Sequence, residues 1–398
     1  MSLTLNANAL TLPQETIYHI GSFLCNSRRD LQMCSLTSRS WHSGVQSHLY
    51  RSITLDSEEK VAELETLVRE HPTVACWIQE LRVTAFTKST RWHANPESWT
   101  KWISRITDEL PAKLINLHSM ELVGLHNPYL SGNHRSSCNF RMAEVIPRLG
   151  LFSTVQSLAF FRCELDDDVA DCFISAYPHL QRLSLRKSLI MSTSVRMHLP
   201  NIRPPRLTTL YVDDNHDSLR KLRLSDSFES LRDVTILVSG QENLGAVKNF
   251  VSQLGSSVKA LSLFIEDENP ASPYPLLPNL TGLCTLRLSP LIGPHTAHIL
   301  STVQSQTLDH VVFSVTPSCL RTLAQSHSQK DTKPAFHPCL LGAALENAKT
   351  VSFVHPELMS QSQVEDALFR ALPPSMCKKG VVRSVKAMEP VADIRTSW

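Results

Sequence analysis

A short apolar motif recurs along most of the chain and constrains its fold more than any other feature. Each copy places three apolar residues at relative positions one, four and six, as in Leu180, Leu183 and Leu185. In the most regular part, position four recurs every 24 to 27 residues, at Leu158, Leu183, Leu210, Val234, Leu261, Leu286 and Val311. More widely spaced or weaker copies are centred on Ile53, Leu81, Met120, Val351 and Val385. A repeat of this length predicts a chain of stacked units rather than one closed core.

Each unit reads as one strand followed by one helix. Positions four and six alternate with polar neighbours, as in a strand with one buried face. The clearest helical stripe between strands consists of Leu244, Val247, Phe250, Val251 and Leu254. Such units bury their apolar faces only by stacking, which predicts a curved parallel sheet inside a shell of helices. The pattern resembles the leucine-rich-repeat family, which implies an α/β solenoid.

The repeats are degenerate. The family's Asn or Cys three residues after position six is present as Cys163 and Asn215, but Glu266 and Leu291 replace it elsewhere. The register is ambiguous around residues 219–224, where an extra strand and a helix both fit, and the units after about residue 317 are irregular. An ordinary mixed α/β domain with Leu-rich strands is the alternative. The extra length of the irregular units lies in polar stretches that we expect to be loops, at 84–99, 126–139 and 317–338.

The segment from Leu12 to Tyr50 has a different pattern, with three short helical stripes in about forty positions. Pro13 suits the first turn of a helix, and Asp30 can cap a second one. Ser38 or Ser40 can cap a third, which carries Trp41, Val45 and Leu49. A unit of this size buries too little apolar surface to be stable alone, so we expect it to dock on a partner.

In its order of apolar positions this segment resembles an F-box. The resemblance implies a three-helix F-box at residues 10–50 and binding to the Skp-type adaptor of a cullin-RING ubiquitin ligase. It implies that the adaptor is contacted by Leu12, Pro13, Ile17, Ile20, Leu24, Leu31 and Leu36. The alternative is that the three helices merely cap the repeats, since solenoids need a polar-faced end. We expect residues 51–398 to form the leucine-rich-repeat-like solenoid.

The residues that flank positions four and six should face out on the concave side of the solenoid. Apolar side chains in the middle of this face, with charged side chains at its edge, would suit a protein interface. The substrate-binding candidates are Phe161, Arg186, Tyr211, Asp213, Leu237, Phe264 and Arg287. The alternative is that loops or the C-terminal segment cover these side chains.

The composition favours a protein partner inside the cell. The 39 basic and 37 acidic residues leave no basic excess for nucleic acid. The N-terminus lacks a signal sequence, and no stretch has the roughly 20 apolar residues that cross a bilayer, so we expect a cytoplasmic or nuclear protein. The ten cysteines are scattered without zinc spacing, and we expect reduced thiols, no metal and no cofactor.

Catalytic motifs are lacking, so we expect no enzymatic activity. The acidic run at Asp166, Asp167 and Asp168 reads as a helix N-terminus rather than a metal site. Trp92, Trp99 and Trp102 could form a binding cluster, but Trp102 lies on a helical stripe and is expected in the core. Together with this, the resemblance to an F-box implies a non-catalytic substrate-recognition subunit of an SCF (Skp-cullin-F-box) E3 ligase. The alternative is a repeat scaffold without a role in ubiquitination.

Overall fold

The computed structural model describes residues 12–25, 27–85, 101–125, 145–191, 205–213, 228–238, 244–265, 277, 279–289, 294–315, 348–355, 360–371 and 382–386. It divides the chain into two compact units, residues 1–156 and 157–398. The ambiguous register at 219–224, Trp92, Trp99 and most of the three predicted loops lie outside the described residues.

The first unit begins with the three helices that the sequence predicts: α1 (Gln14–Phe23), α2 (Arg28–Ser35) and α3 (Arg39–Leu49). Pro13 directly precedes α1. The hydroxyl of Ser38 accepts the backbone N–H of Trp41 at 3.3 Å, which confirms Ser38 as a cap. The cap expected of Asp30 was wrong: Ser27 caps α2 by accepting the backbone N–H of Asp30 at 3.4 Å, and Asp30 lies in the first turn.

These helices have a core of their own. Ile17 of α1, Leu31 of α2 and Val45 of α3 are buried together, and the half-buried side chains packed against them are Leu24, Cys34, Trp41 and Leu49. A close approach of α1 to α3 is possible because position 44 is glycine. A Cβ there would lie 2.4 Å from Cγ2 of Ile17.

The rest of the first unit consists of strand-helix repeats. Its parallel strands lie in the order β1 (Ser52–Leu55), β2 (Glu80–Thr84) and β3 (Ser119–Val123), and their position-four residues Ile53, Leu81 and Met120 are paired in register. The helices between them include α4 (Glu58–Glu70), α5 (Pro72–Ala75) and α7 (Glu109–Lys113), and a further helix spans 145–150. Trp102 is buried, as predicted.

The second unit has a longer parallel sheet in which the strand order follows the chain. Its strands are β4 (Ser157–Phe161), β6 (Arg182–Arg186), β8 (Thr209–Asp213), β9 (Asp233–Val238), β10 (Ala260–Ile265), β11 (Thr285–Ser289), β12 (His310–Ser314), β13 (Thr350–His355) and β14 (Val382–Lys386). The position-four residues from Leu158 to Val351 pair with one another across the described neighbouring strands. One copy was misplaced: Val351 pairs with Val382, so Val382 and not Val385 occupies position four of the last unit.

A repeated hydrogen-bond arrangement shows that the units are equivalent. Before several strands, one backbone carbonyl accepts two backbone N–H groups from the next repeat. The carbonyl of Arg232 accepts from Lys259 at 2.8 Å and Ala260 at 2.9 Å, and the carbonyl of Lys259 accepts from Cys284 and Thr285 at the same distances. Within the first unit, the carbonyls of Arg51 and Gln79 act in the same way. Both units are therefore built from one type of repeat.

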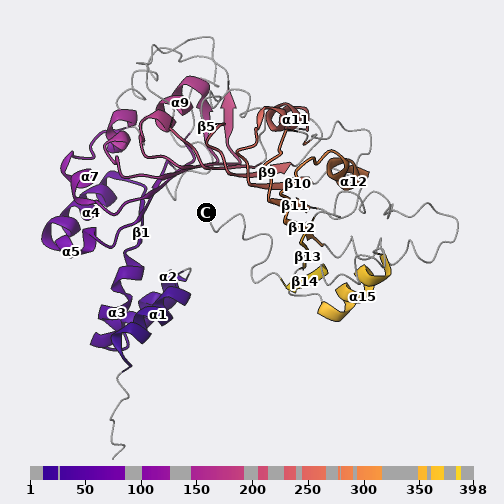
Figure 1. Ribbon diagram of the computed structural model, residues 1–398. Coiled ribbons are helices and arrows are strands. Elements are labelled where there is room, and N and C mark those ends of the chain that lie inside the picture. The colour runs from indigo at the N-terminus through magenta and orange to yellow at the C-terminus, as the bar shows by residue number, and fades with distance from the viewer. Residues whose placement is uncertain are drawn as a thin grey trace, which may run out of the picture. The chain divides into compact units, whose positions relative to one another are not determined.

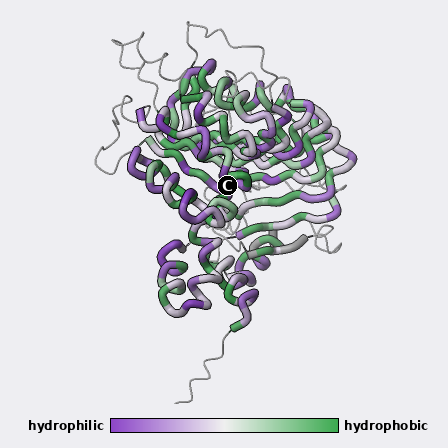
Figure 2. Tube along the Cα trace, turned by 90° about the vertical axis from the view of Figure 1, so that its left-hand side faces the viewer, coloured by the Kyte–Doolittle hydropathy of each residue, from purple (hydrophilic) through white to green (hydrophobic). Residues whose placement is uncertain are grey.

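Helices cover one face of the second unit's sheet. They are α9 (Asp167–Ser175), α11 (Leu244–Gln253), α12 (Pro294–Ser301) and α15 (Gln361–Ala371), and Figure 1 shows α9, α11 and α12 on the outer side of the curved strands. Two short strands, β5 (Glu164–Asp166) and β7 (Leu189–Met191), pair in a separate ladder. Figure 2 shows hydrophobic residues concentrated along the strands, whereas the helices alternate in hydropathy. The second unit is thus the curved parallel α/β solenoid that the repeat predicts.

Candidate functional site

The described residues offer little for metal or acid-base chemistry. Within them, no three His, Cys, Asp or Glu side chains are placed to hold a metal ion. The acidic run is a helix N-terminus, as predicted, with Asp166 directly before α9 and Asp167 and Asp168 in its first turn. In the same part of the chain, no helix has the length and apolar character needed to span a bilayer.

The three N-terminal helices present large apolar side chains to solvent although their own core is filled. Leu36 is 79% exposed and Phe23 is 75% exposed. Leu12, Tyr18 and Met33 are also exposed. Each such side chain gains about 1.5 to 3 kcal/mol on full burial, so a partner that covers several of them would bind favourably. We call Leu12, Phe23, Met33 and Leu36 the apolar surface of the module.

The predicted adaptor residues divide between this surface and the core beneath it. Leu12, Pro13 and Leu36 are exposed, and Ile20 and Leu24 are half-buried. Ile17 and Leu31, however, are each only 1% exposed and pack on Val45. The prediction that Ile17 and Leu31 lie at the contact with the adaptor needs correction. Both side chains are internal, so they support the surface from below and do not lie on it.

Sequence reasoning overlooked Phe23 and Met33. Neither residue was among the predicted adaptor contacts, although Met33 lies between Leu31 and Cys34, which pack inward. The signal was present: both residues are apolar at helical positions that do not belong to the inward stripe. In the structure Phe23 packs edge-on against His19, with ring centroids 4.9 Å apart, and otherwise faces solvent.

The predicted substrate-binding face is more buried than expected. Arg186, Tyr211, Asp213, Leu237 and Phe264 are buried, and Phe161 and Arg287 are half-buried. Five of the seven candidates are therefore buried and not exposed as expected, and substrate binding at this face stays a prediction. Burial also lowers the pKa of Arg287.

Strand register explains which of these residues meet. β6 and β8 pair so that Arg186 lies opposite Asp213, with opposite charges on one face of the sheet. The guanidinium of Arg186 also lies 5.4 Å from the ring centroid of Phe161 on β4, within the range of a cation-π contact. The carboxyl ends of β4, β6 and β8 thus bring Phe161, Arg186 and Asp213 together, whereas Phe264 and Arg287 belong to β10 and β11.

Comparison with known proteins gives one family match and two resemblances to solved structures. The family model for F-box-like domains matches residues 9–56. Two solved structures resemble the chain: TLR13 in a complex with ssRNA13, at 10% identity and a TM-score of 0.32, and an internalin, inlF, from Listeria monocytogenes str. 4b F2365, at 11% identity and a TM-score of 0.25.

The two solved structures differ in how much of each chain the resemblance covers. The TLR13 match covers 88% of this chain but only 38% of the TLR13 chain, whereas the internalin match covers 84% of this chain and 96% of the internalin. No curated protein matches the sequence. The family match at 9–56 and the paired register of the repeats lead to one description: the chain carries an F-box-like domain followed by a leucine-rich-repeat-like parallel α/β solenoid.

Proposed function

We propose that the chain is a non-catalytic substrate-recognition subunit of an SCF E3 ubiquitin ligase. In this proposal residues 10–50 bind a Skp-type adaptor, and the solenoid at 51–398 binds a target protein. F-box domains generally bind Skp-type adaptors, and the family match at 9–56 supports that partner. Neither module needs a catalytic residue, because holding a target near the ubiquitin-charged enzyme raises the rate through proximity.

The observation that carries the proposal is the apolar surface of the three-helix module. Its core of Ile17, Leu31 and Val45 is complete within the chain, yet Phe23 and Leu36 remain exposed. A module that only capped the repeats would be expected to turn a polar face outward. Exposed apolar side chains on a module whose own core is complete instead favour burial against a second polypeptide.

Capture of a purified Skp-type adaptor by the full chain tests the proposal. We expect the wild-type chain to retain the adaptor and the double variant Phe23→Ser with Leu36→Ser to lose it. Ile115→Ser is the matched control, because Ile115 is also apolar and 62% exposed but lies in the repeats. Melting temperatures of the variants show whether each one folds. Loss of capture with Ile115→Ser, or full capture with the double variant, would contradict the proposal.

Target turnover separates the ligase subunit from the scaffold. For a ligase subunit, proteins that co-purify with the solenoid accumulate when the proteasome is inhibited. For a scaffold, their abundance is unchanged by inhibition even though they still co-purify. The double variant of the apolar surface should then abolish the accumulation without abolishing the co-purification.

A further inference from the structure

A second feature of the first unit is a cleft where the three-helix module meets the first repeats. Its volume is about 630 Å³, which is within the range of ligand-binding clefts. Glu15 and Tyr18 line it from α1, Gly44 and His48 from α3, and Trp77 from the segment before β2. The cleft is distinct from the apolar surface, because none of Leu12, Phe23, Met33 and Leu36 lines it.

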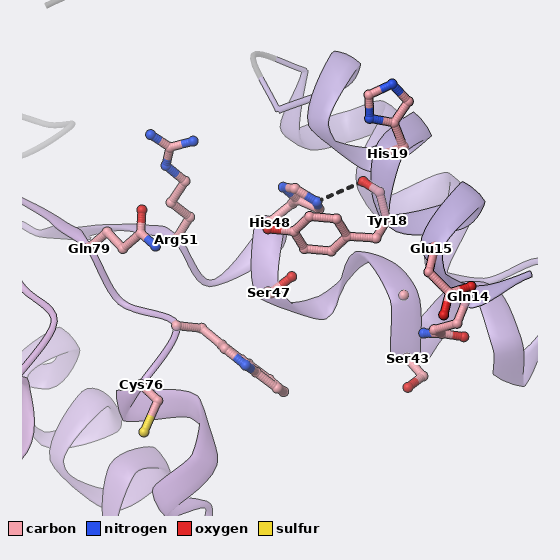
Figure 3. Close-up of a pocket in the computed structure, with 12 residues that line it drawn as sticks. Gln14, Glu15, Tyr18, His19, Ser43, Ser47, His48, Arg51, Cys76 and Gln79 are labelled. Carbon is pink, nitrogen blue, oxygen red and sulfur yellow. Dashed lines mark hydrogen bonds between the residues drawn. The ribbon is translucent and has the colours of Figure 1, made fainter.

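Aromatic rings form part of its wall and are held in place. The rings of Tyr18 and His48 lie 4.5 Å apart between centroids, and Nε2 of His48 donates a hydrogen bond to the backbone carbonyl of Tyr18 at 3.0 Å, as Figure 3 shows. The Trp77 ring stacks on Tyr50, with centroids 6.3 Å apart.

The charges of the cleft favour a cation. Glu15 is exposed, and its carboxylate makes no ion pair or hydrogen bond with the described part of the chain. Arg51 also lines the cleft, but its Nη2 lies 3.2 Å from Oε1 of Glu80, which compensates its charge. The titratable groups that line the cleft are Glu15, Tyr18, His19, His48, Arg51 and Cys76. A carboxylate and aromatic rings that line one cleft attract ammonium and guanidinium groups, the carboxylate by charge and the rings through their faces.

We propose that this cleft binds the lysine or arginine side chain of a partner polypeptide. The ammonium or guanidinium group would pair with the carboxylate of Glu15, and the aliphatic stem would lie against Tyr18 and Trp77. Because both α1 and the segment before β2 line the cleft, such a side chain would contact the F-box-like domain and the first repeats at once. This proposal goes beyond the adaptor function and does not depend on it.

Fluorine NMR of the full chain labelled with 5-fluorotryptophan tests the proposal, with the Trp77 signal assigned from Trp77→Phe. The probes are Nα-acetyl-lysine amide and Nα-acetyl-norleucine amide, which share a linear side chain but differ in the ammonium group. We expect a saturable shift of the Trp77 signal with the lysine probe and none with the norleucine probe. Glu15→Gln should weaken lysine binding about two- to five-fold, as expected for an exposed contact of this kind.

The control variant is Glu70→Gln, because Glu70 is an exposed glutamate of the same unit that does not line the cleft. Its lysine affinity should equal that of the wild type. Three results would overturn the proposal: equal shifts with norleucine and lysine, no shift with lysine, or an unchanged affinity in Glu15→Gln. A larger shift with Nα-acetyl-glutamate amide would overturn it too, since His48 and Arg51 would then form an anion site. Adaptor capture by Glu15→Gln is measured separately, so failure here leaves the F-box proposal standing.

Discussion

At the scale of single residues, Gly44 shows how one missing side chain sets the packing of the F-box-like domain. A Cβ at this position would lie 2.4 Å from Cγ2 and 3.1 Å from Cβ of Ile17. Ile17 cannot yield easily, because it is branched at Cβ and buried in the core of the module. The contact fixes the distance between α1 and α3, and therefore the shape of the surface that they present.

Gly44→Ala should consequently destabilise the chain by about 1 to 3 kcal/mol, through overpacking. Gly255→Ala is the matched control, because a Cβ there meets nothing within 4 Å, and it should change the free energy of unfolding by less than about 1 kcal/mol. Urea denaturation of both variants measures the difference. Equal stability of the two would show that α1 and α3 are not closely packed.

Leu31 lies in the core and Leu36 lies on the surface, although the two residues are close in the sequence. Substitutions at these two positions therefore compare a core position with a surface position. Leu31 is 1% exposed and Leu36 is 79% exposed. Leu31→Ala should lower the free energy of unfolding by about 2 to 5 kcal/mol, because it leaves a cavity. Leu36→Ala should leave stability nearly unchanged and weaken adaptor binding. Denaturation curves and adaptor affinities measured on the same samples check both expectations, and a reversal of the two effects would contradict the assignment.

The reactivity of the Cys172 thiol tests whether this side chain is buried in the second unit. Burial of the Cys172 thiol, aided by the nearby carboxylates of Asp168 and Asp171, raises its pKa from 9.0 to about 11. A raised pKa keeps the thiol protonated at neutral and mildly alkaline pH, and the thiolate is the reactive form. Iodoacetamide should therefore modify exposed Cys76 in the folded chain but spare Cys172, whereas both should react in concentrated urea. Mass spectrometry of the peptides measures how far each cysteine is labelled. Equal labelling of Cys76 and Cys172 in the folded chain would contradict the buried position of Cys172.

The sequence could predict these side chains only in part. Apolar spacing identified Ile17, Leu31 and Val45 as one face of each helix, and the structure packs them together. It could not say whether an apolar residue faces the module's own core or a partner, because both environments select the same residue types. Ile17 and Leu31 were for that reason assigned to adaptor contact although they are buried, whereas Phe23 was missed even though it lies off the inward stripe.

At the scale of elements, the repeat is defined by strand pairing and by the paired hydrogen bonds before each strand. The alternation of apolar and polar residues predicted the strands because one face of the sheet is buried, so a shift of one residue would expose every apolar side chain. It failed at β14, where Ser384 pairs with Phe353 and so takes position six. A polar residue at an apolar position removes the pattern on which register assignment depends.

The hydrogen bonds before the strands can be tested at Ala260, whose N–H donates to the carbonyl of Arg232 at 2.9 Å. Ala260→Pro removes that donor and should lower the free energy of unfolding by about 1 to 3 kcal/mol. Ala260→Ser keeps the N–H and is the control, with a much smaller expected effect. Urea denaturation measures both variants. A proline variant as stable as the serine variant would show that this hydrogen bond contributes little to the repeat.

At the scale of the whole molecule, the chain joins the F-box-like domain to the strand-helix repeats with almost no linker. Only Tyr50 and Arg51 separate the end of α3 from the start of β1, and Tyr50 stacks on Trp77 of the first repeats. The fold class followed from the repeat period, whereas the period left open whether the side chains beside positions four and six are exposed or buried. Their burial depends on contacts between residues far apart in the sequence, which a local pattern does not contain.

Hydrogen-deuterium exchange of the full chain, with and without a purified Skp-type adaptor, tests the central claim most directly. If the apolar surface is the adaptor site, peptides from α1 and α2 gain protection when the adaptor is added, and peptides from the second unit do not change. The same experiment on the Phe23→Ser and Leu36→Ser double variant should show no added protection. The account is contradicted if saturating adaptor leaves α1 and α2 unprotected, or if the protection falls on the solenoid strands instead.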